Sequence, residues 1–83
     1  MDVGVAFGKV LRRLRLAAGL TQEQLGFEAD LRRTYISILE LGQQQPSLAT
    51  ILKLAKALKC SGQELVGVVE SEIRLVSTRR RQL

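Results

Sequence analysis

Residues 21–42 read TQEQLGFEADLRRTYISILELG and have the pattern of two short helices joined by a tight turn. Thr21 and Gln24 stand at the two positions of a capping box, which predicts a helix over about residues 22–29. The apolar pattern then resumes in a new phase and stops at a glycine. A second helix is therefore predicted over about residues 32–41.

The turn between these helices has residues suited to close packing. Gly26 leaves room for the helices to cross, and Asp30 tolerates the positive φ angle that a tight turn requires. The second helix is basic at its start, at Arg32 and Arg33. Two short helices of this kind, over about residues 22–41, form the arrangement that places one helix in the major groove of DNA. The core between them is predicted to contain Leu25, Ala29, Leu31, Ile36 and Leu39.

The flanking sequence predicts three more helices and no strand. One covers about residues 4–18, and one over about residues 62–76 starts at a second capping box. The third is capped by Ser47, and its core-facing side is predicted to be the apolar stripe of Leu48, Ile51, Leu52, Ala55 and Leu58. We therefore expect an all-α, compact five-helix domain over residues 1–78, followed by a basic tail at 79–83.

Composition indicates a polyanionic partner. The chain has 83 residues, with 13 Lys and Arg against 8 Asp and Glu, which gives a net charge of +5. Its three aromatic residues, Phe7, Phe27 and Tyr35, are too scattered to form a stacking platform for single strands. The basic residues do not line one long helix, which argues against a membrane-surface binder. Double-stranded DNA is the expected partner.

The residue inventory argues against an enzyme. There is no histidine and a single cysteine, Cys60, so a nucleophile–base pair and a metal site both lack their residues. We expect no catalytic residues, no metal and no cofactor, with Cys60 as a small buried apolar residue near a helix end. No run is long and apolar enough to cross a bilayer, and no signal-peptide pattern follows Met1, so a cytoplasmic location is expected.

Three stretches carry a resemblance to a known family: residues 12–25, 34–42 and 46–64. They resemble the Xre and Cro-like helix-turn-helix DNA-binding domains of phage repressors and bacterial regulators. The run LRRTYIS at residues 31–37 is similar in particular to the controller proteins of restriction-modification systems. The resemblance implies a lambda-repressor-like fold and a transcriptional regulator.

The resemblance also implies roles for individual residues. The expected contacts to DNA bases are Arg33, Thr34, Ser37 and Ile38, with Arg33 as the most specific reader. The expected contacts to the DNA backbone are Thr21, Gln22, Arg32, Tyr35, Gln43 and Gln44. Arg15 and Glu40 align with a partly buried structural salt bridge. Arg32 departs from the family, which often has a capping Ser or Thr there, and Ile38 replaces a residue that is commonly polar.

A single recognition helix reads too few base pairs to find one site, which predicts a homodimer. The face of the last helix assigned to the core consists of Leu65, Val66, Val69 and Ile73. Val68 and Leu75 lie off this face, and Leu54 is placed similarly on the preceding helix, so these three are the expected dimer contacts. The operator should be a pseudo-palindrome with half-sites about 10 bp apart. RNA polymerase is a further candidate partner.

An alternative function is an antitoxin-like or other protein-interaction module whose DNA binding serves autoregulation. Its last helix would then bind another protein. A complex with the product of a neighbouring gene that survives gel filtration distinguishes this alternative from a free-standing regulator.

Overall fold

The computed structural model describes the backbone of residues 1–82 and the side chains of residues 1–76, and this part of the chain contains five α-helices and no strand. The helices are α1 (Val3–Ala17), α2 (Gln22–Ala29), α3 (Arg33–Glu40), α4 (Leu48–Ala57) and α5 (Gly62–Gln82). The predicted all-α fold with five helices is confirmed.

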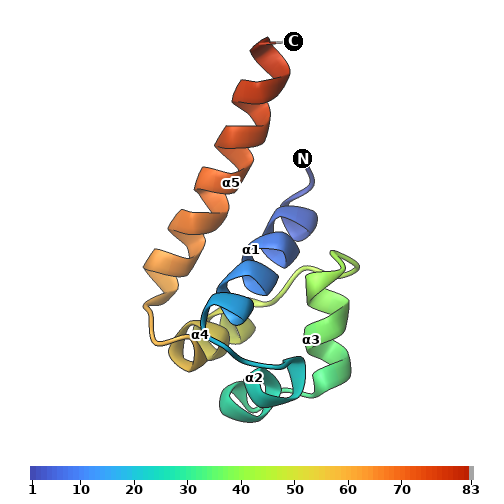
Figure 1. Cartoon of the computed structure of the whole chain (residues 1–83), viewed down its shortest axis with the longest axis vertical. Coiled ribbons are helices and arrows are strands. Elements are labelled where there is room, and N and C mark those ends of the chain that lie inside the picture. Colours follow the sequence, from blue (N-terminus) through green and yellow to red (C-terminus); the bar gives the residue numbers. More distant parts are fainter. Residues whose placement is uncertain (83) are drawn as a thin grey trace.

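The three short helices, α2, α3 and α4, lie toward one end of the molecule, and the longest helix, α5, extends toward the other (Figure 1). Helices α1 and α5 lie side by side and run in opposite directions, and both chain termini lie at the same end. Helices α2 and α3 lie at the other end, where α3 also packs against α1. No helix in the described part of the chain combines the length and apolar character needed to span a lipid bilayer.

Side chains cap the helix starts at the predicted positions. Thr21 Oγ1 accepts from the Gln24 amide at 3.0 Å, and Gln24 Oε1 accepts from the Thr21 amide at 2.9 Å. Ser61 and Glu64 form the same reciprocal pair, with both distances 3.0 Å. One further cap was not predicted. The Asp2 carboxylate accepts a hydrogen bond from the Val5 amide, and α1 therefore begins at Val3.

The core lies among the five helices, each of which contributes to it. Its buried apolar residues are Ala6, Phe7, Val10, Leu11, Leu25, Ala29, Ile36, Leu39, Leu54, Ala55, Leu65 and Val69. The predicted core of the helical pair is confirmed, with Leu31 only partly buried at its edge. An α1 glycine makes one close approach possible, because a Cβ on Gly8 would overlap the Leu39 carbonyl oxygen and lie 2.7 Å from that of Glu40.

The predicted orientation of α4 is wrong in part. Ala55 is buried and Ile51 and Leu58 pack against the core as predicted, but the three leucines Leu48, Leu52 and Leu54 are not placed as predicted. Leu54 is fully buried, so it is not available to a second molecule, whereas Leu48 and Leu52 are 71% and 53% exposed. Apolar residues occur around most of the α4 circumference, and their spacing alone does not select the buried face. Contacts with α2 and α5 select the face that carries Leu54 and Ala55.

Helix α5 differs from its prediction in length and in one core residue. It continues to Gln82, beyond the predicted end at residue 76 and through most of the predicted tail at 79–83, whose last residue lies outside the described part. Leu65 and Val69 are buried and Ile73 packs against the core, but Val66 is 40% exposed. The assignment of Val66 to the core is therefore wrong.

Cys60 lies half-buried after α4, close to the start of α5. Burial raises the pKa of its thiol, and the nearby Glu64 carboxylate raises it further. Since the thiolate is the reactive form, we expect iodoacetamide to alkylate Cys60 more slowly in the folded protein than in urea, with the rate rising at a higher pH. Rates measured across a pH series in both states test this. Identical pH profiles would show that the folded environment does not perturb the thiol.

Candidate nucleic-acid interface

The turn between α2 and α3 has the geometry required for close packing of the two helices. Asp30 takes the left-handed conformation, with φ 57° and ψ 46°, and the Leu31 amide donates to the Gly26 carbonyl at 2.8 Å. A Cβ on Gly26 would lie 2.6 Å from the Leu31 carbonyl oxygen, so a larger residue would push the turn away. The structure thus supports the roles predicted for Gly26 and Asp30, and it sets α3 firmly against α2.

Helix α3 buries one face and turns the other outward. Ile36 and Leu39 are fully buried, and Tyr35 packs against the core on the same side. The opposite side, here called the recognition face, consists of Arg33, Thr34, Ser37 and Ile38, which are exposed or half-buried. Leu41, which is 66% exposed, follows one turn after Ser37 and extends this face. Leu41 is not among the predicted site residues, although its helical spacing places it on this face.

The start of α3 is open and electropositive. Arg32 occupies the N-cap position without a side-chain hydrogen bond to the helix, as its departure from Ser or Thr predicted. Arg32 and Arg33 are both exposed at this end, where the helix dipole is also positive. Unpaired amide groups and two guanidinium groups in one place favour an anionic ligand.

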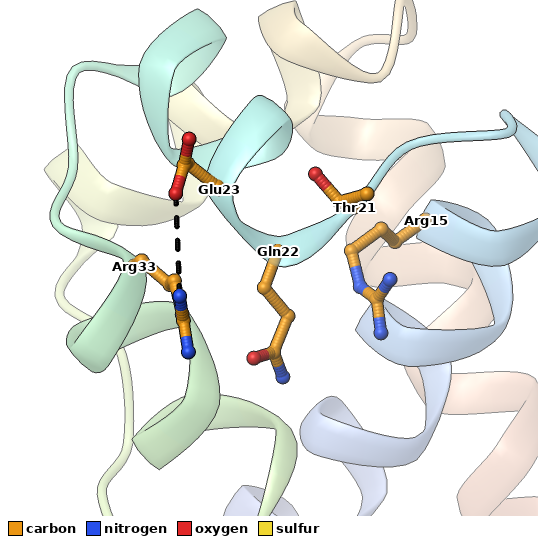
Figure 2. Close-up of a pocket in the computed structure, with 5 residues that line it drawn as sticks. All are labelled: Arg15, Thr21, Gln22, Glu23 and Arg33. Carbon is orange, nitrogen blue, oxygen red and sulfur yellow. Dashed lines mark ion pairs between the residues drawn. The ribbon is translucent and has the colours of Figure 1, made fainter.

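Arg33 has a weak partner on the preceding helix. Its Nη1 lies 4.0 Å from Oε2 of Glu23, and the two side chains are 68% and 81% exposed (Figure 2). An exposed ion pair at this distance contributes little to stability. Arg33 can therefore leave Glu23 for another partner at small cost.

Arg15 and Glu40 form a buried pair between α1 and α3. Arg15 donates through Nε to Glu40 Oε2 at 2.7 Å and through Nη2 to Oε1 at 3.0 Å, and its Nη1 donates to the Leu20 carbonyl at 2.9 Å. The hydrogen bond to Glu40 raises the pKa of Arg15, burial opposes this, and the charge of Glu40 adds to the rise. The two side chains, which the family resemblance had paired, are only 10% and 4% exposed.

Gln22 joins this pair from the first turn of α2. Its Nε2 donates to Glu40 Oε1 at 3.2 Å, a contact between residues 18 positions apart that no local pattern could indicate. Figure 2 shows the Gln22 side chain between those of Arg33 and Arg15, at an open cavity of about 480 Å³. The cavity is lined by Arg15, Thr21, Gln22, Glu23 and Arg33. The start of α2 thus faces the same cavity as the start of α3.

The other predicted site residues fall into two groups. Gln43 and Gln44 are exposed in the loop that follows α3, where the Gln43 amide donates to the Ile38 carbonyl at 3.1 Å. The three expected dimer contacts do not form one surface: Leu54 is buried, Val68 is partly buried against the core, and Leu75 is 55% exposed. Leu48, Leu52 and Val66, which were predicted to face the core, are exposed instead.

A sequence profile of the helix-turn-helix family matches residues 11–65, which include α2, α3, α4, the C-terminal part of α1 and the start of α5. The chain belongs to the helix-turn-helix family. Among its helix-turn-helix relatives, control protein C.BamHI of Bacillus amyloliquefaciens is 41% identical over 66 residues, which cover 78% of this chain and 82% of that protein. The predicted resemblance to controller proteins is confirmed.

Solved structures of helix-turn-helix controller proteins have the same fold. The restriction-modification controller protein C.AhdI of Aeromonas hydrophila matches with a TM-score of 0.72 and 50% identity, over 75% of this chain and 94% of that one. The controller protein C.Esp1396I, solved as a tetramer with its natural 35-base-pair operator, matches with a TM-score of 0.80 and 27% identity, over 88% of this chain and 96% of that one.

Proposed function

We propose that this protein is a sequence-specific, double-stranded-DNA-binding transcriptional regulator that acts as a homodimer on a pseudo-palindromic operator. The main supporting observation is that the recognition face of α3 points outward while its other face is buried. The capped helix α2 and the tight turn after it fix α3 in this orientation. Similarity to a controller protein solved on its operator supports it. The relatives are control proteins and regulators by name, which supports a regulator over an enzyme.

Base reading falls to the recognition face. The Arg33 guanidinium matches the O6 and N7 acceptors of guanine, Thr34 and Ser37 offer hydroxyl groups, and Ile38 offers apolar contact to a thymine methyl group. The backbone of the DNA would be held by Thr21, Gln22, Arg32, Tyr35, Gln43 and Gln44, whose contacts set the register without selecting a sequence.

The decisive variant for sequence reading is Arg33→Ala. We expect it to weaken binding to the operator by about 1–3 kcal/mol, and binding to random duplex DNA far less, because a guanine contact is lost only on the specific site. Fluorescence anisotropy with both DNAs measures the two losses. Lys56→Ala removes the same charge from the exposed side of α4 and serves as the control. Equal losses on both DNAs would mean that Arg33 only neutralises phosphate.

The dimer interface is better placed on an apolar surface shared by α4 and α5. This α4–α5 apolar surface consists of Leu48, Leu52 and Val66, all exposed. Leu52 lies against the start of α5, because a Cβ on Gly62 would be 2.7 Å from its Cδ2. A cavity of about 150 Å³ next to it is lined mostly by apolar residues: Val3, Phe7, Gln45, Pro46, Ile51, Val66 and Val69.

In a twofold dimer, the α4–α5 apolar surface of one copy would pack against the same surface of the second copy, which removes its apolar side chains from water. The dimer would then carry two recognition helices. Leu75 lies nine residues after Val66, on the opposite side of α5, so it is a separate candidate contact and not part of this surface. The two copies of α3 would then lie about 34 Å apart, one turn of DNA, on half-sites about 10 bp apart.

Three finer proposals follow from regulation at an operator. The protein controls its own gene, which nuclease protection of the DNA upstream of that gene would show. RNA polymerase is a partner at the promoter, and the protein acts in the cytoplasm. A fourth proposal concerns the arginines at 79–81, whose side chains lie outside the described part of the chain: they add sequence-independent attraction to phosphate.

A further inference from the structure

The Gln22 side chain is held in one orientation by a buried carboxylate. Glu40 Oε1 accepts from both Gln22 Nε2 at 3.2 Å and Arg15 Nη2 at 3.0 Å, so one oxygen joins α1, α2 and α3. Glu40 cannot turn away, because its other oxygen accepts from Arg15 Nε and its side chain is only 4% exposed.

This contact decides which end of the Gln22 amide faces which neighbour. A carboxylate accepts hydrogen bonds and does not donate them, so only the Nε2 end of Gln22 can face Glu40. One N–H of Nε2 is then used by Glu40, and the second stays available to an oxygen in the cavity that Gln22, Thr21 and Arg33 line. An amide that was free to flip would present its own oxygen to a phosphate half of the time, and that oxygen repels phosphate.

Because Arg15 pairs with Glu40, the carboxylate that orients Gln22 can lie close to an anionic ligand. An unpaired carboxylate in contact with the side chain that binds a phosphate would repel that phosphate across the partly buried site. Arg15 neutralises that charge with two hydrogen bonds, and a third bond to the Leu20 carbonyl fixes the guanidinium itself. The pair thus orders Gln22 without adding net negative charge.

We propose that Arg15 and Glu40 are positioning residues for DNA binding, which hold the Gln22 amide with its free N–H toward a phosphate, in addition to joining α1 to α3. This rests on the proposed function, because it needs Gln22 to contact the DNA backbone. It also predicts that the cost of removing Gln22 depends on whether Glu40 is present.

The test is a double-mutant cycle that preserves folding. Replacing Glu40 alone with an apolar residue leaves Arg15 without an acceptor, so the pair is replaced together by apolar residues of similar size, Arg15→Met with Glu40→Leu, which is often neutral or stabilising for buried pairs. Kd is measured on operator and on random duplex for wild type, Gln22→Ala, the paired variant and the combined variant. Thermal unfolding verifies that each is folded, and Glu40→Gln serves as a second route if the paired variant is not.

The expected result is non-additive. Gln22→Ala raises Kd about fivefold on both DNAs, since a phosphate contact carries no sequence information. The paired variant raises Kd about two- to fivefold, and adding Gln22→Ala to it changes Kd less than about twofold. In the free protein, the side-chain amide signals of Gln22 move toward those of an exposed glutamine in NMR spectra of the paired variant, while those of Gln24 stay in place.

Other outcomes distinguish failure of the positioning role from failure of the proposed DNA-binding function. If the folded paired variant binds DNA as wild type does, or if Gln22→Ala costs the same in both backgrounds, the pair is structural only and the positioning role is overturned. A Gln22→Ala protein that binds as well as wild type also overturns it, since there is then no contact to position. Failure of the wild type to bind any duplex would instead refute the proposed function.

Discussion

Glu40→Ala is expected to lower the free energy of unfolding by about 3–5 kcal/mol, because it leaves the buried Arg15 guanidinium without its carboxylate. A domain of 83 residues has a total of only about 4–12 kcal/mol. The variant should therefore lose a large part of its stability, and each kcal/mol corresponds to about 4–8 °C in the unfolding midpoint. Urea unfolding followed by circular dichroism measures the change.

A second ion pair in the same protein supplies the control. Arg13 Nη1 lies 3.0 Å from Glu72 Oε1, between α1 and α5, but the Arg13 side chain is 56% exposed. Glu72→Ala should cost about 1 kcal/mol or less, since water solvates the arginine that remains. If the two alanine variants lose the same stability, burial does not distinguish the pairs and the expectation for Glu40 fails.

The second large effect concerns assembly. Leu52→Asp puts a charge in the centre of the α4–α5 apolar surface, and we expect it to shift the protein from dimer to monomer. A monomer engages one half-site, so affinity for the full operator should fall about 100-fold or more, because the second half-site no longer binds intramolecularly. Sedimentation velocity at micromolar concentration and operator titrations give the two readouts.

Leu16→Asp is the matched control, because Leu16 is a 56% exposed leucine on α1 that does not line the cavity beside this surface. It should leave both assembly and operator affinity unchanged. A Leu52→Asp protein that still sediments as a dimer would move the interface elsewhere, with Leu75 as the next position to change.

Local chemistry explains which parts of the fold were predictable. Capping boxes at Thr21 and Ser61 depend on residues three positions apart, and the left-handed Asp30 depends on its own side chain. Such features are decided within one helical turn, so the sequence contains what is needed to predict them. The helix starts and the turn were therefore predicted closely.

The orientation of α4 depends on its neighbours instead. Leu52 and Leu54 are two positions apart, each fits an apolar face of a helix, and only packing against α2 and α5 determines that Leu54 is the buried one. The same ambiguity placed Val66 in the core. Because the predicted dimer surface was built on these assignments, its error follows from theirs.

The candidate site also combines features that local sequence determines with features that only the packing of the folded chain determines. Helical spacing places Arg33, Ser37 and their neighbours on one face of α3, whereas the bond from Gln22 to Glu40 joins residues that only the folded chain brings together. Gly8 is a similar case. Nothing around it in the sequence shows that the α3 carbonyls of Leu39 and Glu40 lie where a side chain would be.

If α3 binds DNA as proposed, its uncapped start would couple folding to DNA occupancy. In the free protein, Arg32 and Arg33 lie beside the positive end of their own helix, and no side chain caps it. A bound phosphate would relieve both costs at once, so the duplex would stabilise the helix that reads it. By mass action, the folded state then becomes more stable as operator concentration rises. A protein built in this way should resist unfolding and proteolysis better on its operator than free in solution.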